Sequence, residues 1–214
     1  YVPNTGQPGY TSFNRYYFAQ QDRQGAIIDE RFNGGGSAAD YIVDVLGRDY
    51  DGYFNNPVGD RVPYTSPAAG IWGPKVMIVN EMAGSGGDLL PYMFKRRRIG
   101  PIVGTRTWGG LVATTDTPPF VDGGSMIAPR FGFFSREGRF NVENEGVAPD
   151  VEVENMPKEV IAGRDPQLER AVAEAMRLLK ERPSDRITTE PEAPTWGRRA
   201  LPAPAPRASS PSPR

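Results

Sequence analysis

The sequence predicts an α/β fold in which parallel strands are joined by crossover helices. In one unit, the apolar run Ala26–Glu30 precedes a glycine-rich loop and then a segment with helical periodicity. A second unit repeats this order, because the apolar run Lys75–Asn80 precedes another glycine-rich loop and another helical pattern. Successive strand–loop–helix units are typical of layered α/β proteins. With 214 residues, of which 38% are hydrophobic, the chain is long enough for one domain with a sizeable core.

Periodicity and end signals predict three helices. The first has Ser37 as its N-cap and ends at Gly47. The second begins just after Ser85, and Pro91 fits it only in the first turn, where a missing N–H costs little. The third follows Asp165, its expected N-cap. Its expected buried residues lie one, three or four positions apart: Leu168, Ala171, Val172, Ala175 and Leu179.

Four further apolar stretches are expected to form strands, and glycine-containing turns between some of them indicate an antiparallel section. The turns lie at 122–124 and 137–138. The stretches are 101–105, 111–115, 125–129 and 130–135.

The end of the chain has a different composition. From Pro183 onward it is rich in proline, alanine, serine and arginine, with too few apolar residues to build a core. We therefore expect one domain at 1–182 and a disordered tail at 183–214. Alternatively, the proline–alanine run 201–206 binds a partner in an extended conformation. Because the chain begins without methionine, we also expect it to be a piece of a longer protein.

The composition excludes several classes of function. The 25 basic and 26 acidic residues give a net charge of −1, so there is no general attraction to nucleic acid or anionic lipid. The absence of cysteine excludes disulfides and thiol chemistry. No apolar run approaches the roughly 18 residues of a membrane span, so we expect no membrane contact and, by default, a cytoplasmic protein. No pattern indicates a cofactor or a metal site.

Ser85 stands among glycines in the stretch NEMAGSGGDLLPYMF, between an apolar strand and a helix. The surrounding glycines let the backbone adopt torsions closed to other residues and approach a ligand closely. A helix that begins here directs free N–H groups and its positive dipole end toward the serine oxygen, as a developing oxyanion requires. The competing interpretation, which the residue pattern alone favours, is an N-cap serine in a tight turn. The spacing also differs from G-x-S-x-G, because position 83 is alanine.

The second glycine-rich loop, Asn33–Gly36, allows three interpretations: a phosphate cradle, a source of another oxyanion N–H, or only a tight turn. No nucleotide-binding pattern follows it. The chain contains no histidine, the usual base that activates a serine near pH 7. If Ser85 is catalytic, its base is therefore not histidine or not in this chain. Lys75 and Lys95 are poorly placed for this role, and Asp88 is better explained as a helix-start carboxylate.

Four blocks of sequence together resemble the catalytic carboxyl-terminal domain of the tricorn protease family. The blocks, in chain order, are IIDERFNGGGSAADYIVDVL, VMIVNEMAGSGGDLLPYMF, IGPIVGTRTWGGLVAT and VENEGVAPDVEVE. This family is related to the carboxyl-terminal processing proteases, so the resemblance implies a ClpP/crotonase-like fold, with a layered β-sheet and crossover helices. The resemblance runs from Tyr1 to about Lys180 and does not include the tail.

The resemblance implies a role for each site residue. Ser85 matches the nucleophile, and the N–H of Gly86 matches one donor of the oxyanion hole. The second donor comes from the glycine loop, where Gly35 or Gly36 is favoured and the glycine run leaves the register open. Glu143 matches the carboxylate that orients a catalytic histidine, with Glu145 as an imperfect competitor.

One departure separates this chain from the processing proteases, whose Ser–Lys dyad has its lysine 25 residues after the serine. That position is Gly110 here, and Arg106 cannot replace the lysine because a guanidinium is not deprotonated. The tricorn branch takes its histidine from an upstream domain, which would explain a chain without histidine.

The resemblance therefore implies a serine endopeptidase domain that forms an acyl-enzyme on Ser85. Its expected substrates are short peptides. Its expected partners are upstream β-propeller, histidine-bearing and PDZ-like domains and further copies of itself in a hexamer. An alternative is a peptide-binding or scaffolding domain of the same fold without turnover; acyl-thioester chemistry lacks any signal of a coenzyme pocket. The basic run Lys95–Arg98 either holds a peptide carboxylate or forms a solvated helix end.

Overall fold

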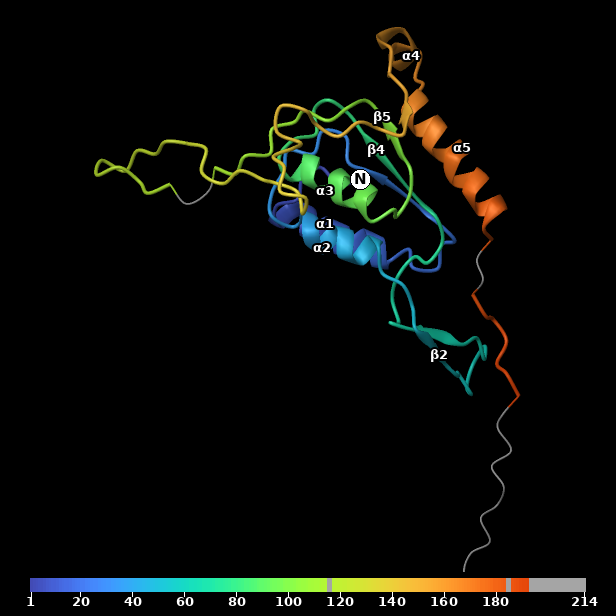
Figure 1. Ribbon diagram of the computed structural model, residues 1–214. Helices are drawn as coiled ribbons and strands as arrows, with labels where there is room; N and C mark the ends of the chain where they lie inside the picture. The colour runs from blue at the N-terminus through green and yellow to red at the C-terminus, as the bar shows by residue number, and fades with distance from the viewer. Residues whose placement is uncertain (115–116, 184–185, 193–214) are drawn as a thin grey trace, which may run out of the picture.

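The computed structural model describes residues 1–114, 117–183 and 186–192 and shows a mixed α/β fold with a parallel sheet (Figure 1). The strands of this sheet lie in the order β1-β4-β5-β6, and each neighbouring pair is parallel. A separate antiparallel pair is formed by β2 and β3. The predicted fold class is confirmed.

The helices are α1 (Gln7–Phe18), α2 (Ala39–Leu46), α3 (Gly86–Arg96), α4 (Pro157–Ile161) and α5 (Pro166–Glu181). The strands are β1 (Ala26–Asp29), β2 (Gly52–Phe54), β3 (Tyr64–Ser66), β4 (Lys75–Val79), β5 (Ile102–Gly104) and β6 (Val151–Glu152).

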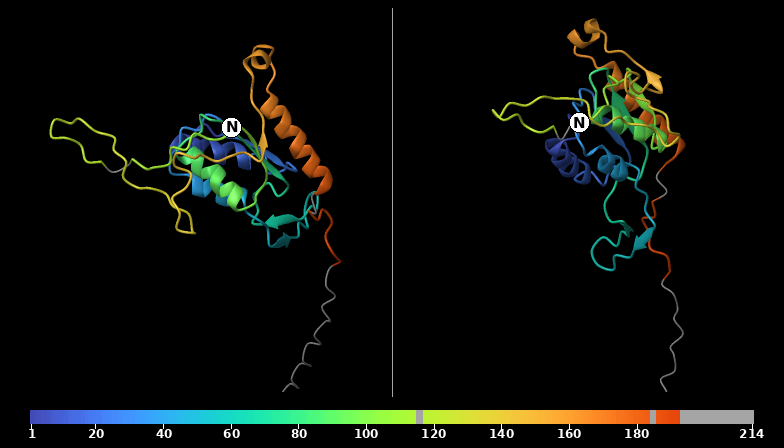
Figure 2. Two further views of the ribbon diagram at one scale, coloured as in Figure 1. Left: turned by 45° about the horizontal axis from the view of Figure 1, so that its top comes forward. Right: turned by 60° about the vertical axis from the view of Figure 1, so that its left-hand side comes forward.

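The parallel sheet lies between two helical layers, with α1, α2 and α3 on one face and α5 on the other (Figures 1 and 2). Alternate residues of β4 face the two layers. Met77 and Val79 belong to the core cluster that includes the first three helices, whereas Val76 and Ile78 pack with α5. Every residue of β4 is buried, which explains why the strand is continuously apolar after its first residue, Lys75.

Two segments project from this layered body: the β2–β3 hairpin and an arm that includes residues 117–131 (Figures 1 and 2). The expected strand at 101–105 is confirmed as β5, but the described residues of the other three stretches form no regular strand. They show only isolated antiparallel bridges, from Ala113 to Phe131 and from Phe134 to Phe140. The reason is that the arm extends away from the sheet, so its apolar residues have no neighbouring strands to pair with.

Two expected helix details are wrong. The N-cap of α2 is Ala38, without a side-chain capping bond, and not Ser37. The Ala38 amide instead donates to the carbonyl of Thr5 at 2.7 Å, so the amino-terminal segment holds the start of α2. Pro91 lies within α3, beyond its first turn. Its ring is buried in the core, and this burial compensates for the intrahelical hydrogen bond that proline cannot donate.

The N-cap of α5 is Asp165, as expected, and its side chain accepts from the Leu168 amide. Ala171 and Ala175 are buried as expected, but Leu168 and Val172 are exposed. The buried stripe is rotated because polar contacts hold the start of the helix, where the Gln167 side chain donates to the Val153 carbonyl at 2.9 Å. The residues that the structure buries are Gln167, Ala171, Glu174, Ala175 and Leu178.

The predicted tail falls largely outside the described residues, since 184–185 and 193–214 are not among them. Within 186–192, the Ile187 amide donates to the Tyr53 hydroxyl at 3.0 Å and the Glu190 side chain accepts from the Asn56 amide at 2.7 Å. In the described part of the chain, no helix combines the length and apolar character needed to span a bilayer.

Candidate active site

The sheet topology brings the two glycine-rich loops together. Because β1 and β4 are parallel neighbours, the loops that follow their carboxyl ends meet at one edge of the sheet. The Gly84 amide donates to the Asn33 carbonyl at 3.0 Å. A Cβ atom on Gly35 would lie 2.6 Å from the Cβ of Ser85 and 2.9 Å from its Oγ, so only glycine allows this close approach. Ser85 and the loop Asn33–Gly36, which the sequence analysis proposed separately, therefore form one site.

Ser85 has an unusual backbone conformation, with φ 57° and ψ −116°. A positive φ is rare for a non-glycine residue and is found where the surrounding structure enforces it, often at functional sites. The constraint here is Asp88, whose buried carboxylate accepts from the Ser85 amide at 2.9 Å. The strain and the buried cap together place Ser85 on a sharp, fixed corner between β4 and α3.

Asp88 also connects this corner to the loop that follows β5. Its carboxylate accepts from the Gly109 amide at 2.8 Å, from the Gly110 amide at 3.0 Å and from the Thr107 hydroxyl. The Gly110 carbonyl in turn accepts from the Ser85 amide at 3.0 Å. Asp88 is thus the helix-start carboxylate that the sequence predicted, and all its described contacts are structural.

The backbone amides near Ser85 differ in whether they donate a hydrogen bond to another protein atom. The Gly35 amide donates to the Asn33 side-chain oxygen at 2.9 Å. In the described residues, the amides of Gly36 and Gly86 donate to no protein atom. These two lie close together, because a Cβ on Gly86 would lie 2.9 Å from the Gly36 nitrogen. The helix dipole of α3 adds positive potential at the same place, so two adjacent amides without a partner among the described residues lie beside the serine.

Glu143 lies at the same edge, held by the segment that follows Gly110. One carboxylate oxygen, Oε2, accepts from the Leu111 amide at 2.5 Å and from the Val112 amide at 2.8 Å. The side chain is half-buried. Glu145 is exposed, and only its backbone makes contacts in the described residues. The geometry therefore connects Glu143, and not Glu145, to the Ser85 corner through Gly110.

A buried polar pair, Glu30 and Asn33, lies beneath the glycine loop. Asn33 donates through Nδ2 to Glu30 at 3.2 Å while its Oδ1 fixes the Gly35 amide. Burial raises the pKa of Glu30 well above its ordinary value, the hydrogen bond from Asn33 opposes this rise, and the nearby Asp88 charge adds to it. Burial therefore favours the protonated form of Glu30 at the base of the loop, where Oε1 is buried and has no hydrogen-bond partner among the described residues.

Sequence reasoning missed the side-chain roles of three residues of this site: Asn33, Glu30 and Thr107. Each is buried and polar, and each acts on backbone amides or carboxylates rather than on a reacting group. A partial signal was available, since Asn33 directly precedes the glycine run and Glu30 directly follows a strand. Among the described residues, no group of histidine, cysteine, aspartate and glutamate side chains has an arrangement that could hold a metal ion.

Comparison with known proteins gives a consistent result. Residues 9–153 match peptidase family S41. The chain is 40% identical to the tricorn protease of Thermoplasma acidophilum over 180 residues, covering 84% of this chain and 17% of that protein. It is 38% identical to tricorn protease homolog 1 of Streptomyces coelicolor over 184 residues, or 86% of this chain and 17% of that one. This chain therefore spans about a sixth of the length of these relatives.

Solved structures agree with this result. The crystal structure of the tricorn protease aligns with a TM-score of 0.77 and 38% identity, over 84% of this chain and 17% of that chain. Mature CPAF complexed with lactacystin aligns with a TM-score of 0.56 over 83% of this chain and 49% of that chain. At 17% identity the latter shows a shared fold alone. From the family match and the tricorn relatives, we conclude that this chain belongs to peptidase family S41, a family of serine-type hydrolases.

Proposed function

We propose that this chain is a serine endopeptidase domain that cleaves peptides through an acyl-enzyme on Ser85. The observation that carries this proposal is the Ser85 corner itself, a serine at φ 57° beside two adjacent free amides. Ser85 is the N-cap of α3, as the competing interpretation expects, but an N-cap requires neither the positive φ nor the packing against Gly35. Membership of a peptidase family supports the same conclusion.

The proposed reaction begins when Ser85 Oγ attacks the carbonyl carbon of the peptide bond while a base removes the hydroxyl proton. The carbonyl oxygen becomes an oxyanion held by the amides of Gly86 and Gly36. We favour Gly36 over Gly35 as the second donor, because the Gly35 amide is engaged by Asn33. Collapse expels the amine, which takes the proton, and leaves an ester on Ser85. Water then attacks this ester, releasing the acid and restoring the serine.

In this proposal the base is a histidine outside this chain, because the chain contains none and the tricorn family takes its histidine from an upstream domain. Glu143 would orient its imidazole and stabilise the imidazolium that forms. Supporting this role, Oε2 of Glu143 is fixed by two backbone amides, whereas no described residue bonds its other oxygen. That free oxygen is available to accept from an incoming imidazole N–H.

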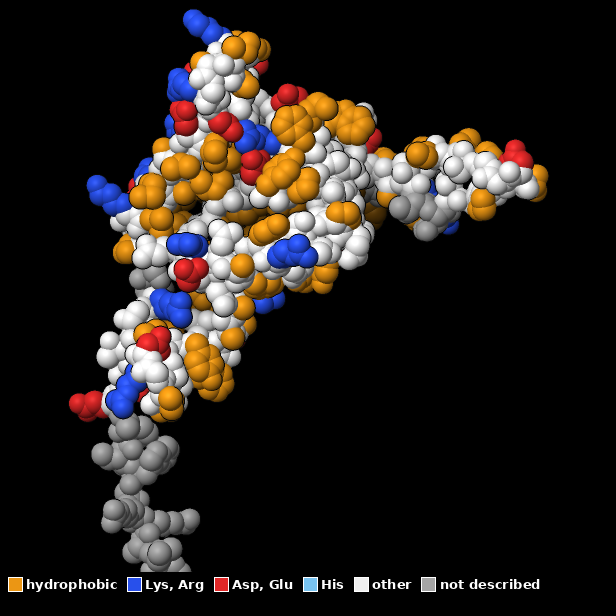
Figure 3. All heavy atoms as spheres, turned by 180° about the vertical axis from the view of Figure 1, so that it is seen from behind, with side chains coloured by type: hydrophobic (Ala, Val, Ile, Leu, Met, Phe, Trp, Pro, Cys, Tyr) orange, Lys and Arg blue, Asp and Glu red, His pale blue; other side chains and the backbone are white. Residues whose placement is uncertain are grey.

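This proposal has further parts, which are taken from likeness to the tricorn family. They are short peptides as substrates, upstream β-propeller and PDZ-like domains, a homohexamer and a cytoplasmic location. Exposed apolar surface supports an assembly of some kind. Figure 3 shows hydrophobic side chains on the projecting arm and along α5. The exposed hydrophobic residues there are Phe120, Val121, Met126 and Ile127 on the arm and Leu168, Val172 and Met176 on α5. We place the domain at 1–182, ending just after α5.

The test uses the longer protein of which this chain is proposed to be a part, here called the intact protein. It compares three single variants and the double variant Ser85→Ala/Glu143→Gln. Ser85→Ala should lower kcat by about 10³–10⁶-fold while peptide binding stays nearly unchanged, because it removes the covalent step and leaves the other substrate contacts in place. Glu143→Gln should cost roughly 10²–10⁴-fold, by analogy with other orienting carboxylates. The two losses should not add, because a misplaced histidine already fails to activate the serine. Glu145→Gln is the matched control and should keep nearly full activity.

A fluorophosphonate adduct mapped by mass spectrometry identifies the nucleophile directly. Labelling of any residue but Ser85, or full activity in Ser85→Ala, would disprove the proposal. The alternative function, peptide binding without turnover, would be supported if the intact protein bound peptides but neither cleaved them nor reacted at Ser85.

A further inference from the structure

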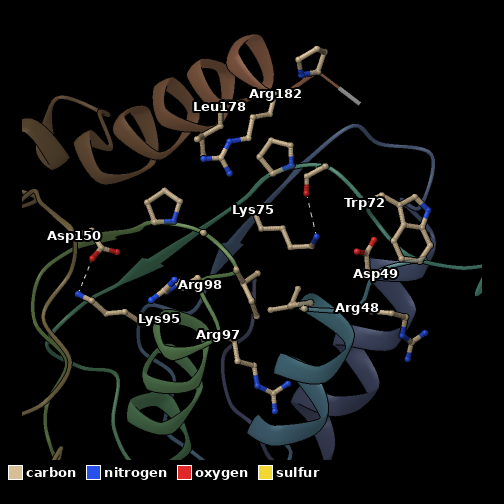
Figure 4. Close-up of a pocket in the computed structure, with 18 residues that line it drawn as sticks. Arg48, Asp49, Trp72, Lys75, Lys95, Arg97, Arg98, Asp150, Leu178 and Arg182 are labelled. Carbon is tan, nitrogen blue, oxygen red and sulfur yellow. Dashed lines mark hydrogen bonds and ion pairs between the residues drawn. The ribbon is translucent and has the colours of Figure 1, made fainter. Parts of the chain in front are cut away.

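A cavity of about 730 Å³ lies at the edge of the sheet opposite to Ser85 (Figure 4). Its walls come from the ends of α2, α3 and α5 and from the start of β4. Lys75 is the first residue of β4, whereas Ser85 follows the carboxyl end of that strand. Since a strand of this length spans about 13 Å, the cavity is separate from the candidate active site.

The cavity is strongly cationic. Lys95 is paired with Asp150 at 2.8 Å, and Arg97 is paired with Asp44. Within the described ranges, none of the other lining arginines has a carboxylate within 4.0 Å of its guanidinium. The protein therefore leaves much of this positive charge uncompensated. The charged lining residues are Arg48, Lys75, Lys95, Arg97, Arg98 and Arg182, with Asp49 and Asp150 as the carboxylates.

Lys75 is the buried member of this set, with only 5% of its surface exposed. Its Nζ donates to the Gly73 carbonyl at 3.2 Å, and in the described structure no carboxylate lies within 4.0 Å of it. Burial lowers the pKa of Lys75 to about 8, and Asp49 opposes this shift from a longer distance. An ammonium group has three donors, so two donors of Lys75 have no partner among the described residues.

Figure 4 shows how these side chains lie around the cavity. Lys75 extends across its middle, Arg182 reaches in from the end of α5, and Arg98 comes from the end of α3. Lys95, from the same helix, points toward its partner Asp150. Arg97 points away from the centre. Three residues of the basic run, Lys95, Arg97 and Arg98, therefore line this cavity. The cavity lies at the opposite end of the strands from Ser85.

We propose that this cavity binds a small polyanion of the phosphate class, such as an oligophosphate, with Lys75 at its floor and Arg98 and Arg182 at its rim. Cations from three separate elements match a ligand with several charged oxygens better than a single carboxylate. Guanidinium groups bind phosphate oxygens in pairs, and a lysine adds a compact point charge. Bound oxygens would also satisfy the two unused donors of Lys75.

Calorimetric titration of the intact protein with inorganic triphosphate at about 150 mM salt tests this proposal. We expect saturable binding at one site for each chain. Lys75→Met, which preserves side-chain volume, should weaken it about 10- to 100-fold, the effect of one charge-assisted hydrogen bond. Arg98→Gln and Arg182→Gln should each weaken it several-fold, about 3- to 10-fold, because these residues are exposed to solvent. Asp49→Asn should strengthen it, since it removes a repulsive charge.

Arg15→Gln, an exposed residue on α1 outside the cavity, is the matched control and should bind like the wild type. Arg98→Gln and Arg182→Gln decide the question if Lys75→Met does not fold. Absence of binding, or equal weakening in Arg15→Gln, would overturn the proposal. So would citrate binding as tightly as triphosphate. Adenosine triphosphate is a further arm: tighter binding than triphosphate would indicate a nucleotide, and equal binding a free oligophosphate, and both support the phosphate class.

Discussion

Glu30 shows how a residue without catalytic chemistry can shape the active site. It is fully buried and holds Asn33, which in turn fixes the Gly35 amide and accepts from the Gly84 amide. This arrangement leaves the next amide, that of Gly36, free beside Ser85. The glycine loop is thus a fixed structure with one engaged and one free donor, although its sequence alone suggests flexibility.

The raised pKa of Glu30 predicts a specific dependence of stability on pH. Below about 4.5, its ordinary value, both the folded and the unfolded chain hold the proton, so Glu30 has no pH-dependent effect. As pH rises above this value, the unfolded chain loses the proton first, and the folded state is progressively destabilised until its own, higher pKa is passed. Glu30→Gln does not titrate and should therefore become more stable relative to wild type between pH 4.5 and pH 8, as measured by urea unfolding.

Glu169→Gln is the control for this measurement. A hydrogen bond from Arg164 lowers the pKa of Glu169, so this variant should show the opposite trend, losing stability relative to wild type as pH rises through the acidic range. The effect should be small because the pair is exposed. Parallel pH profiles for Glu30→Gln and wild type would show that Glu30 is ionised in the folded protein.

At the scale of elements, the two sides of the sheet differ in how the helices pack. On one side α2 and α3 bury hydrophobic faces against β4, while on the other α5 is oriented by polar contacts at its start. Arg31, for example, bridges Asp29 of β1 and the N-cap Asp165 at 2.7 and 2.9 Å. These contacts explain why the buried stripe of α5 differs from the one that hydrophobicity predicts.

Two neighbouring substitutions in α5 test this orientation. Ala171 has no exposed surface, so Ala171→Asp should destabilise the protein by about 3 kcal/mol or more, since it buries an unpaired charge. Val172 is 44% exposed, and Val172→Asp should change stability by less than about 1 kcal/mol. Chemical unfolding of both variants measures the difference. Comparable losses would mean that Val172 is also covered, as the sequence pattern alone suggests.

The elements that sequence reasoning predicted are those whose local pattern agrees with their environment. The strand β4, buried on both faces, is apolar from Val76 to Val79, and the motif around Ser85 follows it directly. By contrast, α1 contains glycine, serine and several aromatic residues, which are poor helix formers, and it depends on tertiary packing of Phe13 and Tyr17 in the core. Sequence alone could not place Asn33 or Thr107 either, because their roles depend on loops brought together by the sheet.

At the scale of the whole molecule, the fold supplies one part of the proposed catalytic apparatus. It positions a serine, two free amides and a fixed carboxylate along one sheet edge, and the chain has no histidine. It also spans only about a sixth of the length of its tricorn relatives. If the proposed mechanism is correct, the missing function is proton transfer, whereas the nucleophile and the oxyanion donors are already in place.

This division predicts how the isolated 214-residue chain behaves. Provided that circular dichroism shows it to be folded, it should hydrolyse peptides no faster than background. It should also react slowly with a fluorophosphonate, because a serine without a base is a weak nucleophile.

Added imidazole should increase the rate of labelling at Ser85 in proportion to its concentration, since it can act as the absent base. The rescue should remain far below the activity of the intact protein, because a positioned base has an effective molarity of about 10⁵ M or more. Ser85→Ala should show no rescue. Appreciable turnover by the isolated chain that Ser85→Ala abolishes would place the base within this chain, and labelling that ignores imidazole would remove the argument for an external histidine.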